Sequence, residues 1–461
     1  MGKTPHSSQL SQYLQPVTQN RFLQFQVLVL ISMYIGYAAF MLCRNTLIAC
    51  SVEIIQDPAL GIDKESFGHL MSWHSAGAIL GKLVTGPGAD LLGGRRMFLL
   101  ALSLTAIANI GFAFSSSFIM FAGFNFFGQA AKAGGWPAMA QIVRSWYPET
   151  RYGQVWSIIA TSSRVGTIAA GLLFGYLLTL IEWRTVFLLS AVLTASVVVL
   201  LFFTLKQNPE DAGLQTLLEP SEDPTTKNGS ETKGSHAHAF DHLTLRQACL
   251  AFVQSGRFWF IAFSIVFLTI VMDFLNFIPI YLAEELRVSA STASMAGTAF
   301  PAGMFTALLL TSFFYDRLSK QQLIIALGAQ LIFSCLAVLL LWKLDFIAAS
   351  LQPPIAIITL FLLGLAISPA YYVPMSVFSV AFGGKHAGFL VAVIDIFGYA
   401  AALIFNYFGG SIAKQYGWPV FLSGLLTVAA LATLCMVTFL TLDYLASKRL
   451  SNESWQAKRT N

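Results

Sequence analysis

The sequence predicts an all-α membrane protein with twelve transmembrane helices arranged as two six-helix bundles. The 461-residue chain is 56% hydrophobic and only 11% charged, whereas soluble domains carry about 25% charged residues. Apolar segments of about 20 residues, the length that crosses a bilayer, recur along the whole chain. The one long hydrophilic stretch, residues 206–256, divides these segments into two sets of six.

The predicted spans follow one another with short loops that contain glycine, proline or charged residues. In the first bundle they cover residues 22–50, 66–88, 97–116, 118–142, 154–180 and 184–204. In the second bundle they cover residues 257–283, 291–313, 322–342, 354–380, 386–412 and 417–443. We therefore expect an N-terminal tail (1–21), an N-terminal bundle (22–204), a linker (205–256), a C-terminal bundle (257–443) and a C-terminal tail (444–461). The linker is rich in Ser, Thr, Pro, Gly and charge, which is typical of flexible segments.

Basic residues collect in the loops on one side of the predicted membrane. They are Arg95, Arg96, Arg144, Arg151, Arg317, Lys320 and Lys385. The opposite loops hold fewer basic residues and several acids, such as Asp57, Asp63, Glu284 and Glu285. Because loops rich in Lys and Arg stay in the cytoplasm, we predict an integral multi-pass protein with both termini cytoplasmic. The membrane is expected to be a bacterial inner membrane or a plasma membrane.

Two loops at equivalent places of the two bundles carry a similar charge pattern. The loop after the second span reads GPGADLLGGRR (86–96), and the loop after the eighth span reads SFFYDRLSK (312–320). A six-plus-six layout with such loops resembles the major facilitator superfamily, whose loop reads G-x-x-x-D-R-x-G-R-R. The resemblance implies that the charged loop residues tie neighbouring helices together on the cytoplasmic side in one access state. The expected gating-loop residues are Asp90, Arg95, Arg96, Asp316 and Arg317.

Further segments of the N-terminal bundle carry motifs of their own. They are YAAFMLCRN (37–45), AGAILGKLVTG (76–86), GGWPAMAQIVRSWYPETRYGQVWSI (134–158), WRTVFLLSAVL (183–193) and NPEDAGL (208–214). Together they resemble the organophosphate:phosphate antiporters, which include glycerol-3-phosphate and hexose-6-phosphate carriers. The resemblance places Arg44 at the first substrate-phosphate arginine of that family and Lys82 at its span-two lysine, both lining a central cavity. Asn45 stands where the family usually has lysine, and Val271 stands where its second phosphate arginine is expected.

Six charged residues lie deep inside the predicted spans. The first bundle contributes four cations and the second two acids: Arg44, Lys82, Lys132, Arg164, Asp273 and Asp395. Since an unpaired charge in hydrocarbon is strongly disfavoured, we expect these residues to meet between the bundles near the midplane, where such carriers bind substrate. Four cations against two acids leave an excess of two positive charges, which predicts an anionic substrate. The planar fork of arginine suits phosphate or carboxylate.

Each basic residue also has a structural interpretation. Lys82 could extend toward a membrane face instead of the cavity. Lys132 precedes the Trp136–Pro137 pair and could support a helix kink. Arg164 could pair with one of the two acids as a structural bridge.

Tyr37, His74 and the two acids are candidates for further roles. Tyr37 shares a helix face with Arg44, so its hydroxyl could contact the substrate, although aromatic packing is an alternative. His74 could titrate near neutral pH or serve as a hydrogen-bonded structural residue. Asp273 and Asp395 could couple proton and substrate binding or simply balance charge.

The sequence therefore predicts a secondary active transporter that moves a small organic anion by alternating access, with phosphate or a proton as the coupling ion. A sugar phosphate or glycerol phosphate is one candidate substrate. The alternatives are a proton-coupled carrier of a carboxylate, a siderophore or drug exporter, and a non-transporting sugar-phosphate sensor. No nucleophile–base pair, phosphate-cradling loop or metal-ligand spacing is present, so we expect no enzymatic activity, metal or cofactor. We expect a monomer in the bilayer that binds no nucleic acid.

Overall fold

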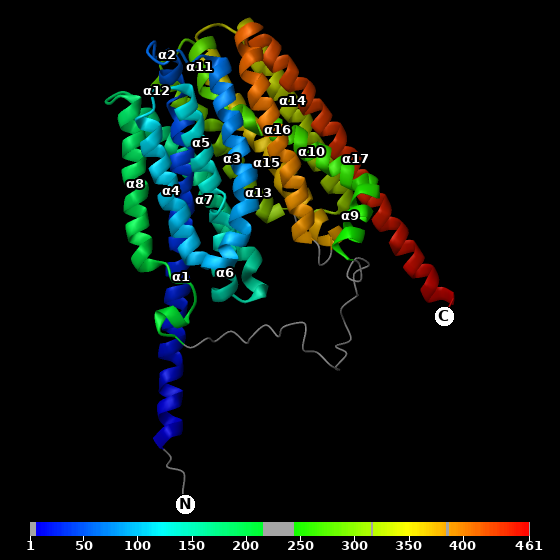
Figure 1. Ribbon diagram of the computed structural model, residues 1–461. Coiled ribbons are helices and arrows are strands. Elements are labelled where there is room, and N and C mark those ends of the chain that lie inside the picture. Colours follow the sequence, from blue (N-terminus) through cyan, green and yellow to red (C-terminus); the bar gives the residue numbers. More distant parts are fainter. Residues whose placement is uncertain (1–5, 215–243, 315–316, 384–386, 461) are drawn as a thin grey trace, which may run out of the picture.

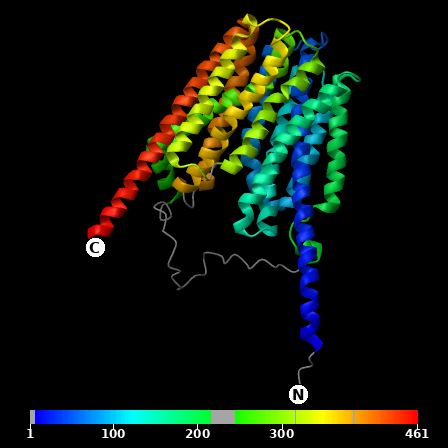
Figure 2. The same cartoon turned by 180° about the vertical axis from the view of Figure 1, so that it is seen from behind.

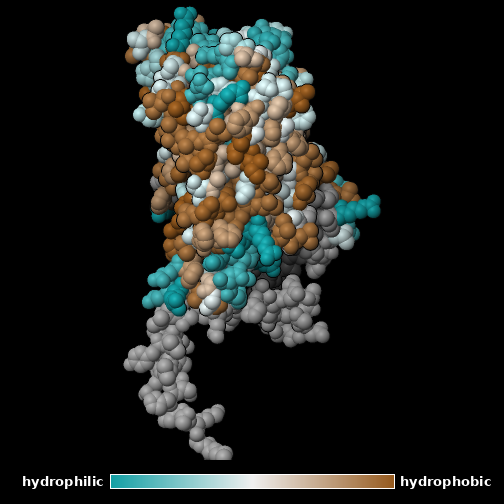
Figure 3. Space-filling model, turned by 60° about the vertical axis from the view of Figure 1, so that its left-hand side comes forward, coloured by the Kyte–Doolittle hydropathy of each residue, from teal (hydrophilic) through white to brown (hydrophobic). Residues whose placement is uncertain are grey.

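The computed structural model describes residues 6–214, 244–314, 317–383 and 387–460, and these form helices joined by short turns. The helices run side by side along one long axis (Figure 1). Both chain ends lie at one end of this axis, here called the terminus side, and α2 and α11 lie at the opposite end, the far side (Figures 1 and 2). On the face drawn in Figure 3, hydrophobic residues form a band between two hydrophilic ends, as expected of a protein that crosses a bilayer.

The N-terminal half contains eight helices in the described part of the chain. They are α1 (His6–Ala49), α2 (Ser51–Gln56), α3 (Lys64–Leu92), α4 (Gly94–Ala113), α5 (Phe118–Lys132), α6 (Gly135–Trp146), α7 (Tyr152–Leu177) and α8 (Trp183–Thr204). In the C-terminal half the structure gives α9 (Leu245–Gln254), α10 (Gly256–Asp273), α11 (Ile278–Glu285), α12 (Ala290–Gly297), α13 (Ala299–Phe314), α14 (Lys320–Trp342), α15 (Gln352–Gly383), α16 (Ala387–Gln415) and α17 (Gly417–Thr460).

The membrane fold predicted from the sequence is confirmed. Ten candidate spans in the described residues are long and apolar enough to cross a bilayer. Helix α3 and the broken pair α5–α6 run beside them in the positions of the second and fourth predicted spans (Figure 1). The first and last helices extend beyond the predicted spans, since α1 begins at His6 and α17 continues to Thr460. Hydropathy locates the end of the apolar segment, whereas Lys, Arg, Glu and Gln can continue the helix into water.

Three predicted spans are interrupted rather than continuous. The fourth breaks between α5 and α6 directly after Lys132, the seventh breaks after Asp273 at a 3₁₀ turn, and the eighth breaks after Gly297. Beside the first break a Cβ on Gly94 of α4 would lie 2.4 Å from the Ala138 carbonyl oxygen of α6, so glycine allows these two helices to approach closely. Interrupted helices in transporters often mark the substrate site, because they place helix ends at mid-membrane depth.

Candidate functional site

The two halves pack against each other through α3 with α16 and through α7 with α12 and α13. Glycines make the first contact close: a Cβ on Gly68 would lie 2.4 Å from the Asn406 carbonyl oxygen, and one on Gly410 would lie 2.2 Å from that of Lys64. Small residues let membrane helices approach in this way. These positions lie toward the far side, where the halves also come closest in the ribbon views (Figures 1 and 2).

Lys82 and Asp395 form an ion pair that connects the two halves. The Lys82 Nζ lies 2.7 Å from the Asp395 Oδ2 and 4.5 Å from the centre of the Tyr399 ring. The side chains of Lys82 and Asp395 are 37% and 30% exposed. Lys82 therefore faces the other half of the molecule rather than a membrane surface, and its pair is partly accessible to water.

Arg44 lies on the wall of a small cavity inside the N-terminal half. Residues of α1, α3, α4, α5 and α8 enclose about 30 Å³, room for one or two water molecules. His74 and Lys132 line the same cavity. The Arg44 Nε and the His74 Nε2 are buried with no hydrogen-bond partner among the described residues, and Lys132 is only 8% exposed. The cavity thus gathers three basic side chains, and no acid stands among its described lining residues.

Asparagines fix the frame of this cavity. The Asn125 Oδ1 lies 3.1 Å from the His74 Nδ1, and the Asn125 amide donates to the Leu70 carbonyl at 2.7 Å. Asn109 donates to Ser190 at 2.7 Å and to the carbonyl of Cys43, the neighbour of Arg44, at 3.3 Å. His74 therefore has the hydrogen bond of a structural histidine, while its second ring nitrogen has no such bond.

Asp273 occupies the end of α10 in the C-terminal half, where the seventh span breaks. Its Oδ2 accepts a hydrogen bond from Asn406 Nδ2 at 2.7 Å, and the Asn406 Oδ1 accepts one from Asn276 at 3.1 Å. Both asparagines are buried. Asp273 also interacts electrostatically with Arg44 of the other half. Sequence reasoning did not single out these asparagines, because a lone Asn in an apolar span gives no signal of its partner.

Arg164 and Tyr37 make aromatic contacts. The Arg164 guanidinium lies 4.4 Å from the centre of the Tyr372 ring of α15, which is a cation–π contact between the halves. No ion pair of Arg164 with Asp273 or Asp395 is recorded in the described part of the chain, so the structural bridge considered for it is not formed. Tyr37 packs edge-on against Trp136, with ring centres 5.6 Å apart, so the aromatic-packing alternative describes its contacts.

The predicted gating-loop residues are only partly visible. Asp316 and the side chain of Asp90 lie outside the described residues, and Arg96 and Arg317 are exposed. Arg95 donates to the Phe202 carbonyl at 2.6 Å and thereby ties α4 to the end of α8.

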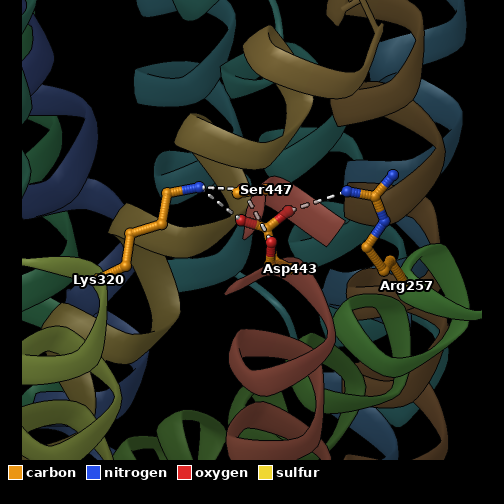
Figure 4. Close-up of polar contacts among 4 residues, drawn as sticks. All are labelled: Arg257, Lys320, Asp443 and Ser447. Atoms are coloured by element: carbon orange, nitrogen blue, oxygen red, sulfur yellow. Dashed lines mark hydrogen bonds and ion pairs between the residues drawn. The ribbon is translucent and has the colours of Figure 1, made fainter. Parts of the chain in front are cut away.

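A charge cluster on the terminus side joins three helices of the C-terminal half. Figure 4 shows Asp443 of α17 between Arg257 of α10 and Lys320 of α14. The Asp443 oxygens lie 3.0 Å from Arg257 Nη1 and 3.3 Å from Lys320 Nζ, and Lys320 also donates to Ser447 at 2.6 Å. The loop after the eighth span thus ties neighbouring helices through Lys320, the last residue of its charged motif at 312–320.

A second charge cluster joins the two halves at the far side, and we call it the far-side clasp. The Lys414 Nζ of α16 lies 2.6 Å from Asp63 Oδ2 and 2.9 Å from Glu65 Oε2 of the N-terminal half. The Lys64 Nζ lies 2.9 Å from Glu284 Oε2 of the C-terminal half. The sequence shows these residues only as charged positions in loops and does not reveal their partners, because the pairs form only once both halves are folded.

Two helical bundles in a bilayer, with charged residues gathered inside and between them, define a polytopic membrane transporter. The model of the Major Facilitator Superfamily matches residues 33–283 and 258–457, and the chain belongs to this superfamily.

The chain is similar to carriers of phosphorylated compounds and to a membrane sensor protein. It is 25% identical to a probable hexose phosphate transport protein of Chlamydia pneumoniae, over 91% of this chain and 92% of that protein. It is 24% identical to a glycerol-3-phosphate transporter of Bacillus subtilis (91% and 93%) and 23% identical to the membrane sensor protein UhpC of Escherichia coli (89% and 91%). The resemblance drawn from the motifs is confirmed.

Solved structures share the fold. A bacterial homolog of the human lysosomal transporter Spinster superposes with a TM-score of 0.64 at 18% identity, covering 92% of this chain and 95% of that one. The D-xylose-proton symporter superposes with a TM-score of 0.67 at 12% identity, covering 90% and 97%.

Proposed function

We propose that the protein is a secondary active transporter that moves a small phosphorylated metabolite, of the size of a sugar phosphate or glycerol phosphate, by alternating access. The observation that carries the proposal is the gathering of Arg44, Lys132 and His74 around one cavity without an acid among its described lining residues. Buried cations need an anion, and an anionic substrate would supply it. The names of the similar carriers support phosphate as the anionic group.

The far-side clasp supports alternating access. Contacts that join the halves at one end stabilise the state closed at that end, and they must break when the opposite state forms. Under the positive-inside rule the terminus side is cytoplasmic, so the clasp would close the protein toward the outside. We further propose a bacterial inner membrane or plasma membrane as the location, a monomer as the working unit, and phosphate or a proton as the coupling ion.

A counterflow assay in liposomes tests this proposal. We expect uptake of labelled glucose-6-phosphate or glycerol-3-phosphate to rise when the liposomes contain phosphate. If uptake ignores internal phosphate but collapses when the proton gradient is removed, phosphate exchange is wrong and proton coupling replaces it. Specific ligand binding without any flux would instead support a sensor, the function that the name of one similar protein states.

The Lys82–Asp395 pair yields a double-variant prediction. Removing one partner leaves the other without its counter-ion, so Lys82→Gln and Asp395→Asn should each lower stability by about 1–2 kcal/mol. The double variant removes both charges and should recover most of that loss, because no unpaired charge remains. Thermal unfolding in detergent measures the effect. If the double variant loses as much stability as the two single variants together, the single substitutions do not act by breaking this ion pair.

The far-side clasp should weaken in acid. Burial of Asp63 disfavours its charged form, but hydrogen bonds from Lys414 and Ser66 outweigh burial and hold the pKa of Asp63 below its ordinary value. The hydrogen bond from Lys414 likewise lowers the pKa of Glu65. The clasp is therefore complete above the ordinary carboxyl pKa values, about 3.9 for Asp and 4.3 for Glu, and is lost as pH falls through the lowered ones. Amide hydrogen exchange at the start of α3, corrected for intrinsic rates, should accelerate over that window, whereas exchange in α8 should not.

A further inference from the structure

We propose that the substrate carries an amine beside its anionic group, and that Asp273 receives the amine. This inference rests on the proposed transport function and narrows its substrate class from phosphate esters in general to zwitterionic ones.

Asp273 lies where the seventh span breaks, and one of its carboxylate oxygens is available to bind a ligand. The hydrogen bond from Asn406 occupies its Oδ2, and no bond to its other oxygen is recorded in the described part of the chain. The Asn406 side chain is fixed in turn by Asn276 and by its own bond to the Ala402 carbonyl at 2.7 Å. A carboxylate held in this way on a buried frame is oriented before any ligand arrives, which reduces the cost of binding.

The break in the seventh span strengthens the preference for a cation. Helix α10 ends at Asp273 and passes directly into the 3₁₀ turn Phe274–Asn276, and the C-terminal end of an α-helix carries partial negative charge. The carboxylate and the helix end therefore attract the same kind of group. In the N-terminal half, Lys132 lies in the last turn of α5, and the partial negative charge of that helix end stabilises its positive charge.

The other acid between the halves is already neutralised. Asp395 has the Lys82 ammonium at 2.7 Å, whereas no ion pair within 4 Å is recorded for Asp273 among the described residues. Its charged neighbour is Arg44 across the interface, and Arg44 is the residue that the proposed function assigns to the substrate anion. When an anion engages Arg44, Asp273 loses its counter-charge unless the substrate brings one.

The C-terminal half also lacks the cation that a simple phosphate clamp would need here. Val271 is completely buried, and the half-buried charged residue of this segment is Asp273. The N-terminal half therefore contributes two cations, Arg44 and Lys132, at its cavity, and the C-terminal half contributes a carboxylate, Asp273, that interacts electrostatically with Arg44. A ligand with a phosphate at one end and an ammonium at the other matches both kinds of charge, while a plain phosphate ester matches only the cations.

The test compares two probes that differ only in the amine. Glucosamine-6-phosphate and glucose-6-phosphate have the same ring and phosphate, so counterflow competition between them isolates the contribution of the ammonium group. We expect the native protein to prefer glucosamine-6-phosphate by about tenfold or more, because a site built for a charged group discriminates against the analogue that lacks it. Asp273→Asn should bring this ratio close to one, mainly by lowering uptake of glucosamine-6-phosphate. The exposed Asp345 of the far side provides the matched control, since Asp345→Asn should keep the native ratio.

The outcomes separate the two proposals. If the native protein takes glucose-6-phosphate as well as its amino analogue, the zwitterion inference is wrong and phosphate-ester transport stands. If Asp273→Asn keeps the preference for the amine, Asp273 is not its partner and the inference is also wrong. If the native protein moves neither compound, the zwitterion inference is wrong, and counterflow of glycerol-3-phosphate decides whether phosphate-ester transport stands. The ratio in the native protein decides the substrate class even if the variant does not fold.

Discussion

Substitution of Arg44 by lysine is expected to reduce uptake by about 10- to 150-fold, the loss that corresponds to one charge-assisted hydrogen bond of about 1.5–3 kcal/mol. The guanidinium lies on the cavity wall with a buried Nε that has no hydrogen-bond partner among the described residues. A lysine would keep the charge but would replace the planar fork by a single ammonium group, which cannot make two parallel bonds to a phosphate. The effect should therefore exceed that of an ordinary conservative change.

Arg287 supplies the control for this prediction. It lies exposed in a far-side loop, so Arg287→Lys makes the same chemical change away from the cavity and should leave uptake at the native level. Initial rates of counterflow in liposomes, normalised to the amount of reconstituted protein, measure both variants. Uptake of Arg44→Lys close to that of the native protein would mean that Arg44 does not contact the substrate directly.

The class of fold was predictable because it depends on properties that are local in sequence. Span length and hydropathy follow from the thickness of a bilayer, and the hydrophilic stretch at 206–256 divides the chain without any tertiary information. The same properties could not reveal the breaks after Lys132 and Asp273. A break depends on the packing of neighbouring helices, such as the close approach of Gly94 to the backbone of Ala138, and such packing has no counterpart in hydropathy.

The charged residues of the candidate site could be selected from the sequence, but their pairing could not. Depth in a span can be read from sequence, and Arg44, Lys82 and Asp395 were selected in that way. The direction in which each side chain points depends on helix rotation, which the weak periodicity of buried spans leaves undetermined. The structure divides these residues into two groups. Lys82 and Asp395 form an ion pair between the halves, whereas Arg44, Lys132 and His74 line a cavity inside the N-terminal half.

The far-side clasp could not be predicted as a cluster, because its residues are up to 351 positions apart in sequence, from Asp63 to Lys414. If it holds the far side closed, reversal of one charge should change the conformational equilibrium strongly. Lys414→Glu would place a third carboxylate beside Asp63 and Glu65, so two attractions become two repulsions at the same short distance. We expect amide hydrogen exchange to accelerate severalfold at the start of α3 and at the end of α16. Counterflow should slow, because each cycle must pass through the closed state that the substitution disfavours.

A matched reversal and a charge swap separate this effect from a general loss of stability. Lys343→Glu reverses an exposed far-side charge whose recorded contacts are with Trp342 and Phe346 of its own half, so it should not change exchange at the interface. Lys64→Glu and Glu284→Lys should each weaken the clasp, and the double variant should restore part of it, because the pair is re-formed with opposite polarity. The restoration will be incomplete, since Trp418 donates to Glu284 at 2.7 Å and cannot donate to a lysine. If Lys414→Glu leaves both exchange and counterflow unchanged, the clasp is a surface contact that does not control access, and closure of the far side must then depend on the close packing of α3 against α16 at Gly68 and Gly410.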